Sequence, residues 1–157
     1  MPAMSKIWLL GHDLSEHSNQ AAQLAAKELQ WKSGTLILLH VYQVPIAPLS
    51  FAGVHIETSY MNEAQLAEVL EKNSREALEK IAAHLREKFP NVVIKTLVKT
   101  GEASDVILHL SEELKVERIV VGSHSRKGLE RFFTGSVAER VVHGSHVSVL
   151  VIKHEEC

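Results

Sequence analysis

Short apolar runs alternate along the chain with longer stretches in which apolar residues return at helical spacing. The first run, residues 6–11, stays apolar until a glycine ends it, which is typical of a buried strand. The stretch after it places Ala22, Ala25, Ala26 and Leu29 on one face of a helix. The pattern predicts strands at residues 6–11, 35–41, 92–99, 117–122 and 147–152, and helices at 15–30, 61–88, 104–114 and 136–143.

Helix-length connections between apolar strands require a parallel sheet with helices on both of its faces. The sequence therefore predicts an α/β fold, formed as one doubly wound domain over residues 1–157. In the longest helix, 61–88, the predicted buried face has apolar residues at three- and four-residue spacing, and Val69 is one of them. The stretch 42–60 contains two prolines and has no clear period, so we expect a long loop there.

The bulk properties of the chain fit one globular domain and argue against several classes of partner. A net charge of −2 over 157 residues gives no basic surface for nucleic acid or for an anionic membrane. No segment approaches the roughly 20 apolar residues of a membrane span, and residues 7–10 are too short for the apolar core of a signal peptide. Cys157 is the single cysteine, so no intramolecular disulfide can form. We therefore expect a cytoplasmic protein without nucleic-acid or membrane partners.

Two loops at predicted strand ends carry the candidate chemistry. They are GHDLSEH, after the first strand, and GSHSRKG, after the fourth. In an open parallel sheet, ligands bind beyond the carboxyl ends of the strands, where the winding reverses. Chain order does not say which strands are neighbours, but if the first and fourth are, these loops face each other across one crevice.

The loop after the fourth strand has the parts that an anion needs. Gly122 and Gly135 allow close approach of the backbone, and Ser136 begins a helix whose N–H groups favour phosphate. Arg126 and Lys127 supply positive charge, the arginine in a form that binds an oxyanion bidentately. The loop is therefore a candidate phosphate site.

Two of the candidate residues have a second interpretation as helix caps. Ser136 and Glu139 have the spacing of a capping box, in which the serine only closes its own helix. Asp13 can accept from ribose hydroxyls, a recurring duty of a carboxylate at such a strand end, but with Glu16 it could also cap the first helix, as could Ser15. The residues alone leave both interpretations open.

The chain resembles the universal stress protein family over nearly its whole length. In the ATP-binding branch of that family the pattern G-x2-G-x9-G-[ST] follows the fourth strand. Gly122, Ser125, Gly135 and Ser136 keep every spacing of this pattern, and RIVVGSH before it and GSVAERV with VSVLVI after it are also similar to the family.

Two further stretches carry the resemblance. GHDLSEHS resembles the first loop of the family, where an aspartate contacts the ribose, and Asp13 stands in that place. LLHVYQVP resembles the end of its second strand, where a valine packs near the adenine, and Val41 is the match. Gly11 and His12 differ from the proline-rich or valine-rich versions that are common in the first loop.

The resemblance implies a five-stranded parallel sheet in the order 3-2-1-4-5, which makes the first and fourth strands neighbours. It also implies a homodimer, a role in stress survival and ATP as the ligand, with room for Mg²⁺ beside the triphosphate; a further protein partner is left open. The nucleotide-binding residues expected on this basis are Gly11, His12, Asp13, Val41, Val121, Gly122, Ser125, Arg126, Gly135, Ser136 and Val137. Another branch of the family lacks the motif, so the alternative is a dimeric interaction module that binds no nucleotide.

Ser125 departs from the pattern, which has its second glycine there. A serine costs on the order of 1 kcal/mol if the backbone must be left-handed, and more if its side chain points into the phosphate space. In an ordinary conformation it would instead lend a hydroxyl donor to the ligand. Both alternatives stay open from the sequence.

The last predicted strand, VSVLVI, is the expected dimer contact. In the implied order it lies at an edge of the sheet, with Val147, Val149 and Val151 on one face and Leu150 and Ile152 on the other. An edge strand that is apolar on both faces is a template for pairing, and two-fold pairing with its own copy closes the contact.

The sequence predicts no catalytic residues and no metal site. There is no G-x4-G-K-[ST] loop for phosphoryl transfer and no visible base for hydrolysis, so we expect no enzyme, with slow ATP hydrolysis left open. His143 and His146 have a ligand-like spacing, and His124 and His154 are candidates for further ligands. Because imidazolium at a helix end suits the helix dipole, surface histidines are the preferred interpretation.

Overall fold

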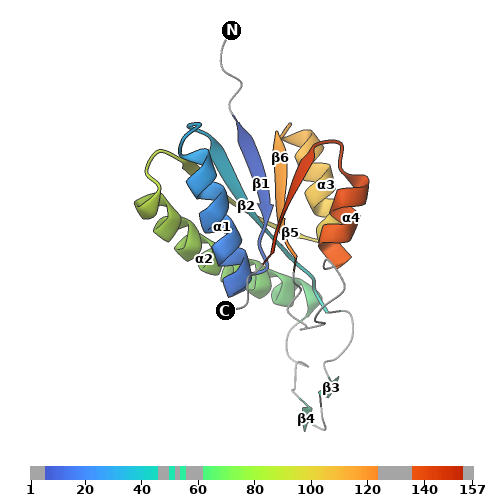
Figure 1. Ribbon diagram of the computed structural model, residues 1–157. Coiled ribbons are helices and arrows are strands. Elements are labelled where there is room, and N and C mark those ends of the chain that lie inside the picture. The colour runs from blue at the N-terminus through green and yellow to red at the C-terminus, as the bar shows by residue number, and fades with distance from the viewer. Residues whose placement is uncertain (1–5, 46–49, 52–53, 56–61, 124–135, 154–157) are drawn as a thin grey trace.

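The computed structural model describes residues 6–45, 50–51, 54–55, 62–123 and 136–153. Its elements alternate as the apolar pattern predicts (Figure 1). In chain order they are β1 (Ile7–Gly11), α1 (Glu16–Leu29), β2 (Thr35–Tyr42), β3 (Ser50–Phe51), β4 (Val54–His55), α2 (Glu63–Lys88), β5 (Val93–Thr100), α3 (Ala103–Glu113), β6 (Arg118–Gly122), α4 (Ser136–Gly144) and β7 (Ser148–Ile152).

Five of the strands form one parallel sheet in the order β5-β2-β1-β6-β7. Numbered among the predicted strands, this is the order 3-2-1-4-5, so the predicted doubly wound α/β fold is confirmed. β1 and β6 are neighbours, with Trp8 opposite Arg118 and Leu10 opposite Val120. The two loops with candidate chemistry therefore leave the sheet side by side.

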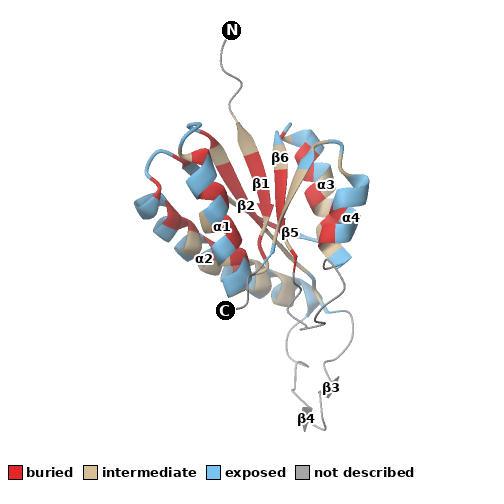
Figure 2. Cartoon of the chain, viewed as in Figure 1, coloured by how far each residue is buried: buried red, intermediate tan, exposed pale blue. Residues whose placement is uncertain are grey.

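Helices cover both faces of the sheet, α1 and α2 on one side and α3 and α4 on the other (Figure 1). Strand residues alternate between two apolar clusters: Trp8 and Leu10 pack with α1 and α2, while Leu9 packs with α3 and α4. Both clusters are buried along the strands (Figure 2). Small side chains let α1 approach the sheet closely, and these are Ala21, Ala22, Ala25 and Ala26, each at most 1% exposed.

Two local expectations differ from the structure. The predicted loop 42–60 contains a short antiparallel pair, β3 with β4, whose two-residue strands are too short to show any period. Val69, expected on the buried face of α2, is 41% exposed. It lies nine residues before Leu78, which turns it roughly 180° away from that buried residue around the helix.

A capping box closes the N-terminus of α2, with Asn62 as the N-cap. Asn62 accepts from the backbone N–H of Gln65 at 2.8 Å, and the Gln65 side chain accepts from the backbone N–H of Asn62 at 3.0 Å.

Within the described residues, none of the helices is both long enough and apolar enough to cross a membrane.

Candidate functional site

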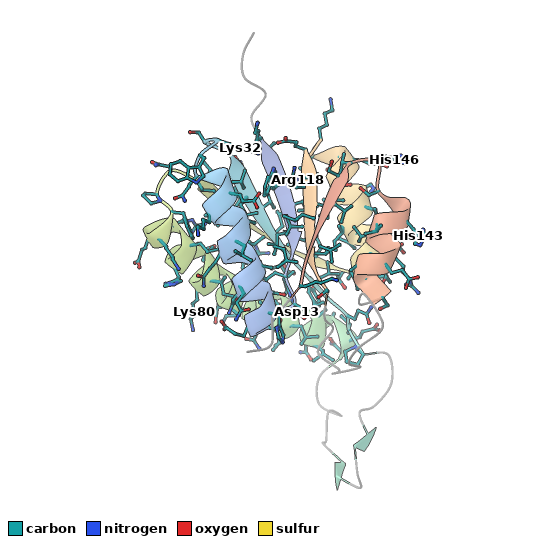
Figure 3. The ribbon with its side chains drawn as sticks, in the orientation of Figure 1. Asp13, Lys32, Lys80, Arg118, His143 and His146 are labelled. Atoms are coloured by element: carbon teal, nitrogen blue, oxygen red, sulfur yellow. The ribbon has the colours of Figure 1, made fainter. Side chains whose placement is uncertain are left out.

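The site is built where β1 and β6 end next to each other. Asp13 lies at the carboxyl end of the sheet, opposite the end where Lys32 and Arg118 are found (Figure 3). α4 also begins at the carboxyl end (Figure 1), so Ser136 and its helix N-terminus lie on the same side of the domain as Asp13. This is the edge at which parallel α/β sheets bind ligands.

The turn from β1 into α1 holds the Asp13 carboxylate in place. Its Oδ1 accepts from the backbone N–H of Ser15 at 2.9 Å and from the hydroxyl of Ser18 at 2.7 Å. The N-cap of α1 is Ser15, whose Oγ accepts from the backbone N–H of Ser18 at 3.2 Å. For α1, the choice between Asp13 and Ser15 as the cap is thereby resolved. Ser15 caps the helix, and Asp13 is anchored in front of it.

His12 is buried, and each of its polar groups is bonded within the protein. Its side chain is 3% exposed. Nε2 lies 3.0 Å from Oδ1 of Asn19, and Nδ1 accepts from the backbone N–H of Leu14 at 3.0 Å. Its own N–H donates to the carbonyl of Leu39, and its carbonyl accepts from Nδ1 of His40 at 2.8 Å. Burial lowers the pKa of His12 from 6.5 to about 4, although the neighbouring Asp13 charge acts in the opposite direction.

The side chain of His40 is half-buried, and its Nδ1 bonds to the carbonyl of His12. This contact ties the end of β2 to the loop that follows β1. Val41, the next residue, is also half-buried and packs with the cluster under α3 and α4. Val41 and Asp13 therefore belong to adjacent strand ends, as the predicted site requires.

Two glycines at the strand ends have different surroundings. A Cβ on Gly11 would lie 3.0 Å from Cδ1 of Ile107, so this glycine leaves room for the Ile107 side chain of α3. A Cβ on Gly122 would meet no described atom within 4 Å. As far as the described residues go, the space beside Gly122 is therefore open at the point where the sequence predicts a phosphate.

Ser123 follows Gly122 and continues the buried face of β6, in the alternation of Ile119 and Val121. It is 6% exposed, and its backbone N–H donates to the carbonyl of Ile152 at 3.0 Å. Its Oγ has no hydrogen-bond partner among the described residues. Buried polar atoms are rarely left without a partner, so this hydroxyl needs an explanation.

The structure brings together most of the predicted nucleotide-binding residues at this edge. Gly11, His12, Asp13, Val41, Val121, Gly122, Ser136 and Val137 are described, whereas Ser125, Arg126 and Gly135 lie outside the described residues. Of the described set, Val121 is buried at 3% exposure, Ser136 is exposed, and Val137 packs with the α3 and α4 cluster.

Three residues of the site were not predicted from the sequence. Ser18 and Asn19 bond to Asp13 and His12, but each lies on the first turn of a helix, where polar residues are ordinary. Ser123 could have been found from the sequence. It follows Ile119 and Val121 at two-residue spacing, which places its hydroxyl on the buried face of the strand, where a hydroxyl needs a hydrogen-bond partner.

The histidines at the end of α4 lie away from this edge, on the outer side of the domain (Figure 3). Nε2 of His146 is 3.6 Å from a carboxylate oxygen of Glu112, and His143 lies in the last turn of α4. His124 and His154 lie outside the described residues. Among the residues that the structure places, no group of three or more His, Cys, Asp or Glu side chains could hold a metal ion.

Comparisons with known proteins agree with this architecture. A model of the universal stress protein family matches residues 4–153. The chain is 33% identical over 143 residues to a universal stress protein of Methanocaldococcus jannaschii, a match that covers 91% of this chain and 77% of that protein. Universal stress protein UspA from Lactobacillus plantarum has a similar structure, with a TM-score of 0.75 at 18% identity over 96% of this chain and 99% of that chain.

Two other similar structures contain a nucleotide. The universal stress protein from Archaeoglobus fulgidus in complex with dAMP has a TM-score of 0.63 at 17% identity, covering 95% of this chain and 98% of that chain. A universal stress protein in complex with cAMP has a TM-score of 0.62 at 21% identity, covering 98% of this chain and 100% of that chain. At these identities the three solved structures show the shared fold alone.

Proposed function

Because this chain belongs to the universal stress protein family, we propose that it binds an adenine nucleotide, ATP foremost, between the carboxyl ends of β1 and β6. The observation that carries the proposal is the pairing of an anchored carboxylate with an open strand end. Asp13 is held by Ser15 and Ser18 on one side, and on the other no described atom lies within 4 Å of a Cβ placed on Gly122. β1 and β6 are adjacent strands, so one ligand can span both.

Each part of an adenine nucleotide has a counterpart at this edge. The ribose hydroxyls would donate to the Asp13 carboxylate, and the adenine would pack against Val41. The phosphates would lie over Gly122 and the N-terminus of α4, where the backbone N–H groups of Ser136 and Val137 favour an anion. The spacing of the glycine motif supports a triphosphate, and Mg²⁺ would accompany it.

The hydroxyl of Ser123, which has no partner among the described residues, supports a polar ligand beside β6. Leaving a buried hydroxyl without a partner costs about 1–3 kcal/mol, and Ser123 Oγ has none among the described residues. A phosphate, or a water molecule held by it, would satisfy this group. Ser123 is therefore compatible with an anion bound at the end of β6.

The neighbours that contain nucleotides support the same chemical class. One contains dAMP and the other cAMP. The two ligands share an adenine base, a sugar and a phosphate, which are the three parts that the edge around Asp13 and Gly122 can accommodate.

The proposed role is regulatory, in a cytoplasmic dimer, and is one of binding rather than catalysis. β7 is an edge of the sheet, and its residues from Val149 to Ile152 remain only partly buried in the single chain. Val149 and Val151 pack on one face of the sheet and Leu150 and Ile152 on the other. Pairing β7 with its own copy would cover both faces and close the edge.

A competing function is an interaction module with the same fold and no nucleotide. It is favoured by the internal bonds of Asp13, since Oδ1 already accepts from Ser15 and Ser18. Mass spectrometry of the small molecules released by denaturing the purified protein separates the two functions. We expect an adenine nucleotide in the released fraction; a preparation free of nucleotide that also fails to take up added ATP would favour the interaction module.

A further inference from the structure

We propose that His12 is a positioning residue, which holds the turn that presents the Asp13 carboxylate to the ribose of the bound nucleotide. The inference rests on the proposed function and assigns a task to a side chain that is itself too buried to reach a ligand. It follows from how the imidazole is bonded on both of its nitrogens.

The hydrogen bonds fix which nitrogen of His12 holds the proton. The backbone N–H of Leu14 can only donate, so Nδ1 must accept from it. The proton of the neutral ring is therefore on Nε2, and it is donated to Oδ1 of Asn19. The amide of Asn19 is oriented for this role, because its Nδ2 donates to Oε2 of Glu16 at 3.1 Å.

The bond to Leu14 stabilises a backbone conformation that leucine does not favour. Leu14 has a φ of +65°, in the left-handed region where a side chain crowds the backbone. Two contacts hold it there: its N–H bonds to His12 Nδ1, and its side chain packs against the apolar cluster under α1 and α2. Asp13 lies between these two fixed residues, so its direction depends on both.

A matched hydrogen bond anchors the other side of Asp13. Ser18 donates from its hydroxyl to Asp13 Oδ1 at 2.7 Å, and the backbone N–H of Asp13 donates back to the same hydroxyl at 3.2 Å. Ser18 and Asn19 are consecutive residues on the first turn of α1, and they bond to Asp13 and His12 respectively. The start of the helix therefore holds two consecutive loop residues at once.

The arrangement requires a neutral imidazole. A proton on Nδ1 would oppose the Leu14 N–H with a second donor, and the turn would lose its bond. The groups that face His12 are Asp13 on its own loop, which favours the cation, and His40 on β2, which opposes it. Glu16 is linked to His12 through Asn19, and Lys80 and His84 line the same groove between α1 and α2 as Asn19 does. Burial outweighs these charges and keeps the pKa of His12 low, so the turn is intact at neutral pH.

Two amide variants separate the two hydrogen bonds of the ring. In His12→Asn, the side-chain oxygen takes the place of Nδ1 and can still accept from Leu14, whereas the link to Asn19 is lost. In His12→Gln, the side-chain nitrogen takes the place of Nε2 and can still donate to Asn19, whereas the acceptor for Leu14 is lost. The variants are similar in polarity and neither titrates.

The experiment measures how well the protein discriminates between ATP and 2′,3′-dideoxy-ATP, by calorimetry on the full chain. Because only the ribose hydroxyls differ, the ratio of the two dissociation constants reports on Asp13. We expect wild type and His12→Asn to prefer ATP by about tenfold or more, and His12→Gln to lose most of that preference while it binds the dideoxynucleotide within about twofold of wild type. An equal preference for ATP in all three proteins overturns the inference.

A second measurement separates the inference from the function on which it rests. If wild type binds neither nucleotide, the proposed function fails, and hydrogen exchange at the Leu14 amide then tests the turn itself. Exchange that is slow in wild type and His12→Asn, and about tenfold faster in His12→Gln, supports a turn held by His12; equal exchange in all three overturns it. Should His12→Gln not fold, His12→Leu takes its place, because leucine fills the buried space of the ring and likewise offers no acceptor to the Leu14 N–H.

Discussion

The backbone N–H of Leu14 donates to Nδ1 of His12 over 3.0 Å, although Leu14 adopts a left-handed backbone with a φ of +65°. This bond exists only for a neutral imidazole, because a protonated ring offers no acceptor. Asp13, between the two residues, is the carboxylate that we assign to the ribose. The carboxyl end of β1 is therefore shaped by a buried histidine before any ligand binds.

Acid should destabilise the fold through His12. In the unfolded chain the imidazole has its ordinary pKa of 6.5, whereas burial lowers the pKa in the folded protein to about 4. Below pH 6.5 the unfolded chain gains protons that the folded protein does not, so the free energy of unfolding falls until the pH reaches about 4. The loss from this residue totals about 3 kcal/mol, at ~1.4 kcal/mol per pH unit.

Urea unfolding of wild type and His12→Asn at about pH 7 and about pH 5 tests this. We expect wild type to lose about 2 kcal/mol more than the variant between the two pH values. His143→Asn, which removes an exposed histidine from α4, serves as the control and should behave as wild type does. A variant with the same pH dependence as wild type would show that His12 is not the group responsible.

A methyl group at Gly122 should weaken nucleotide binding without harming the fold. Its Cβ would meet no described atom within 4 Å, so Gly122→Ala should change the free energy of unfolding by less than about 1 kcal/mol. The methyl group would occupy space that we assign to phosphate, and ATP affinity should fall by about tenfold or more.

The matched substitution is Gly11→Ala, where the methyl group would lie 3.0 Å from Cδ1 of Ile107. This variant should lose about 1 kcal/mol of stability or somewhat more, because the Ile107 side chain must shift to make room. Thermal unfolding and ATP titration of both variants check the pair. If Gly122→Ala binds ATP as tightly as wild type does, the phosphates do not bind at this strand end.

Lysine in the middle of β7 should separate the proposed dimer. Val149 packs on the α3 and α4 face of the edge strand, and Val149→Lys would place a charge in each copy of the contact. The control is Val93→Lys, at a residue that is 53% exposed on β5, the opposite edge. Sedimentation should give monomer for the first variant and dimer for the second. A wild-type chain that sediments as a 17.5 kDa monomer at tens of micromolar would contradict the dimer itself.

If the Ser125 side chain crowds the triphosphate, replacing it by glycine should restore the glycine pattern of the motif and tighten ATP binding. The expected gain is about threefold to tenfold, from roughly 1 kcal/mol of relieved strain. Competition with a fluorescent ATP analogue measures it. Weaker binding in Ser125→Gly would mean that the serine hydroxyl donates to the ligand, and unchanged affinity would show that Ser125 faces away from it.

Much of the fold follows from the sequence because buried parallel strands and amphipathic helices leave strong local patterns. The two faces of the last strand are an example: Val149 and Val151 pack on one side of the sheet, Leu150 and Ile152 on the other, as alternation predicts. The order of the strands is not local, and it was expected from the family resemblance. The strand pair β3 and β4 was not predicted, because a strand of two residues shows no alternation of apolar and polar positions.

The candidate site was predictable only in part, since its residues have different kinds of signal. Gly122 and Asp13 stand in loops with unusual composition directly after strands. The bond between His12 and Asn19 joins the loop after a strand to the first turn of a helix, seven positions further along the chain. No rule of sequence spacing predicts such a bond. Whether Asp13 or Ser15 caps α1 depended on backbone geometry, which the sequence does not reveal.

The central claim is that an adenine nucleotide binds between the ends of β1 and β6. Calorimetric titration of the wild-type chain with ATP tests it most directly, with Asp13→Ala titrated in parallel. We predict saturable binding with about one nucleotide per chain, weakened by about tenfold or more in the variant because the ribose loses its acceptor. No binding by wild type at millimolar ATP, or equal affinity in the two proteins, would contradict the account.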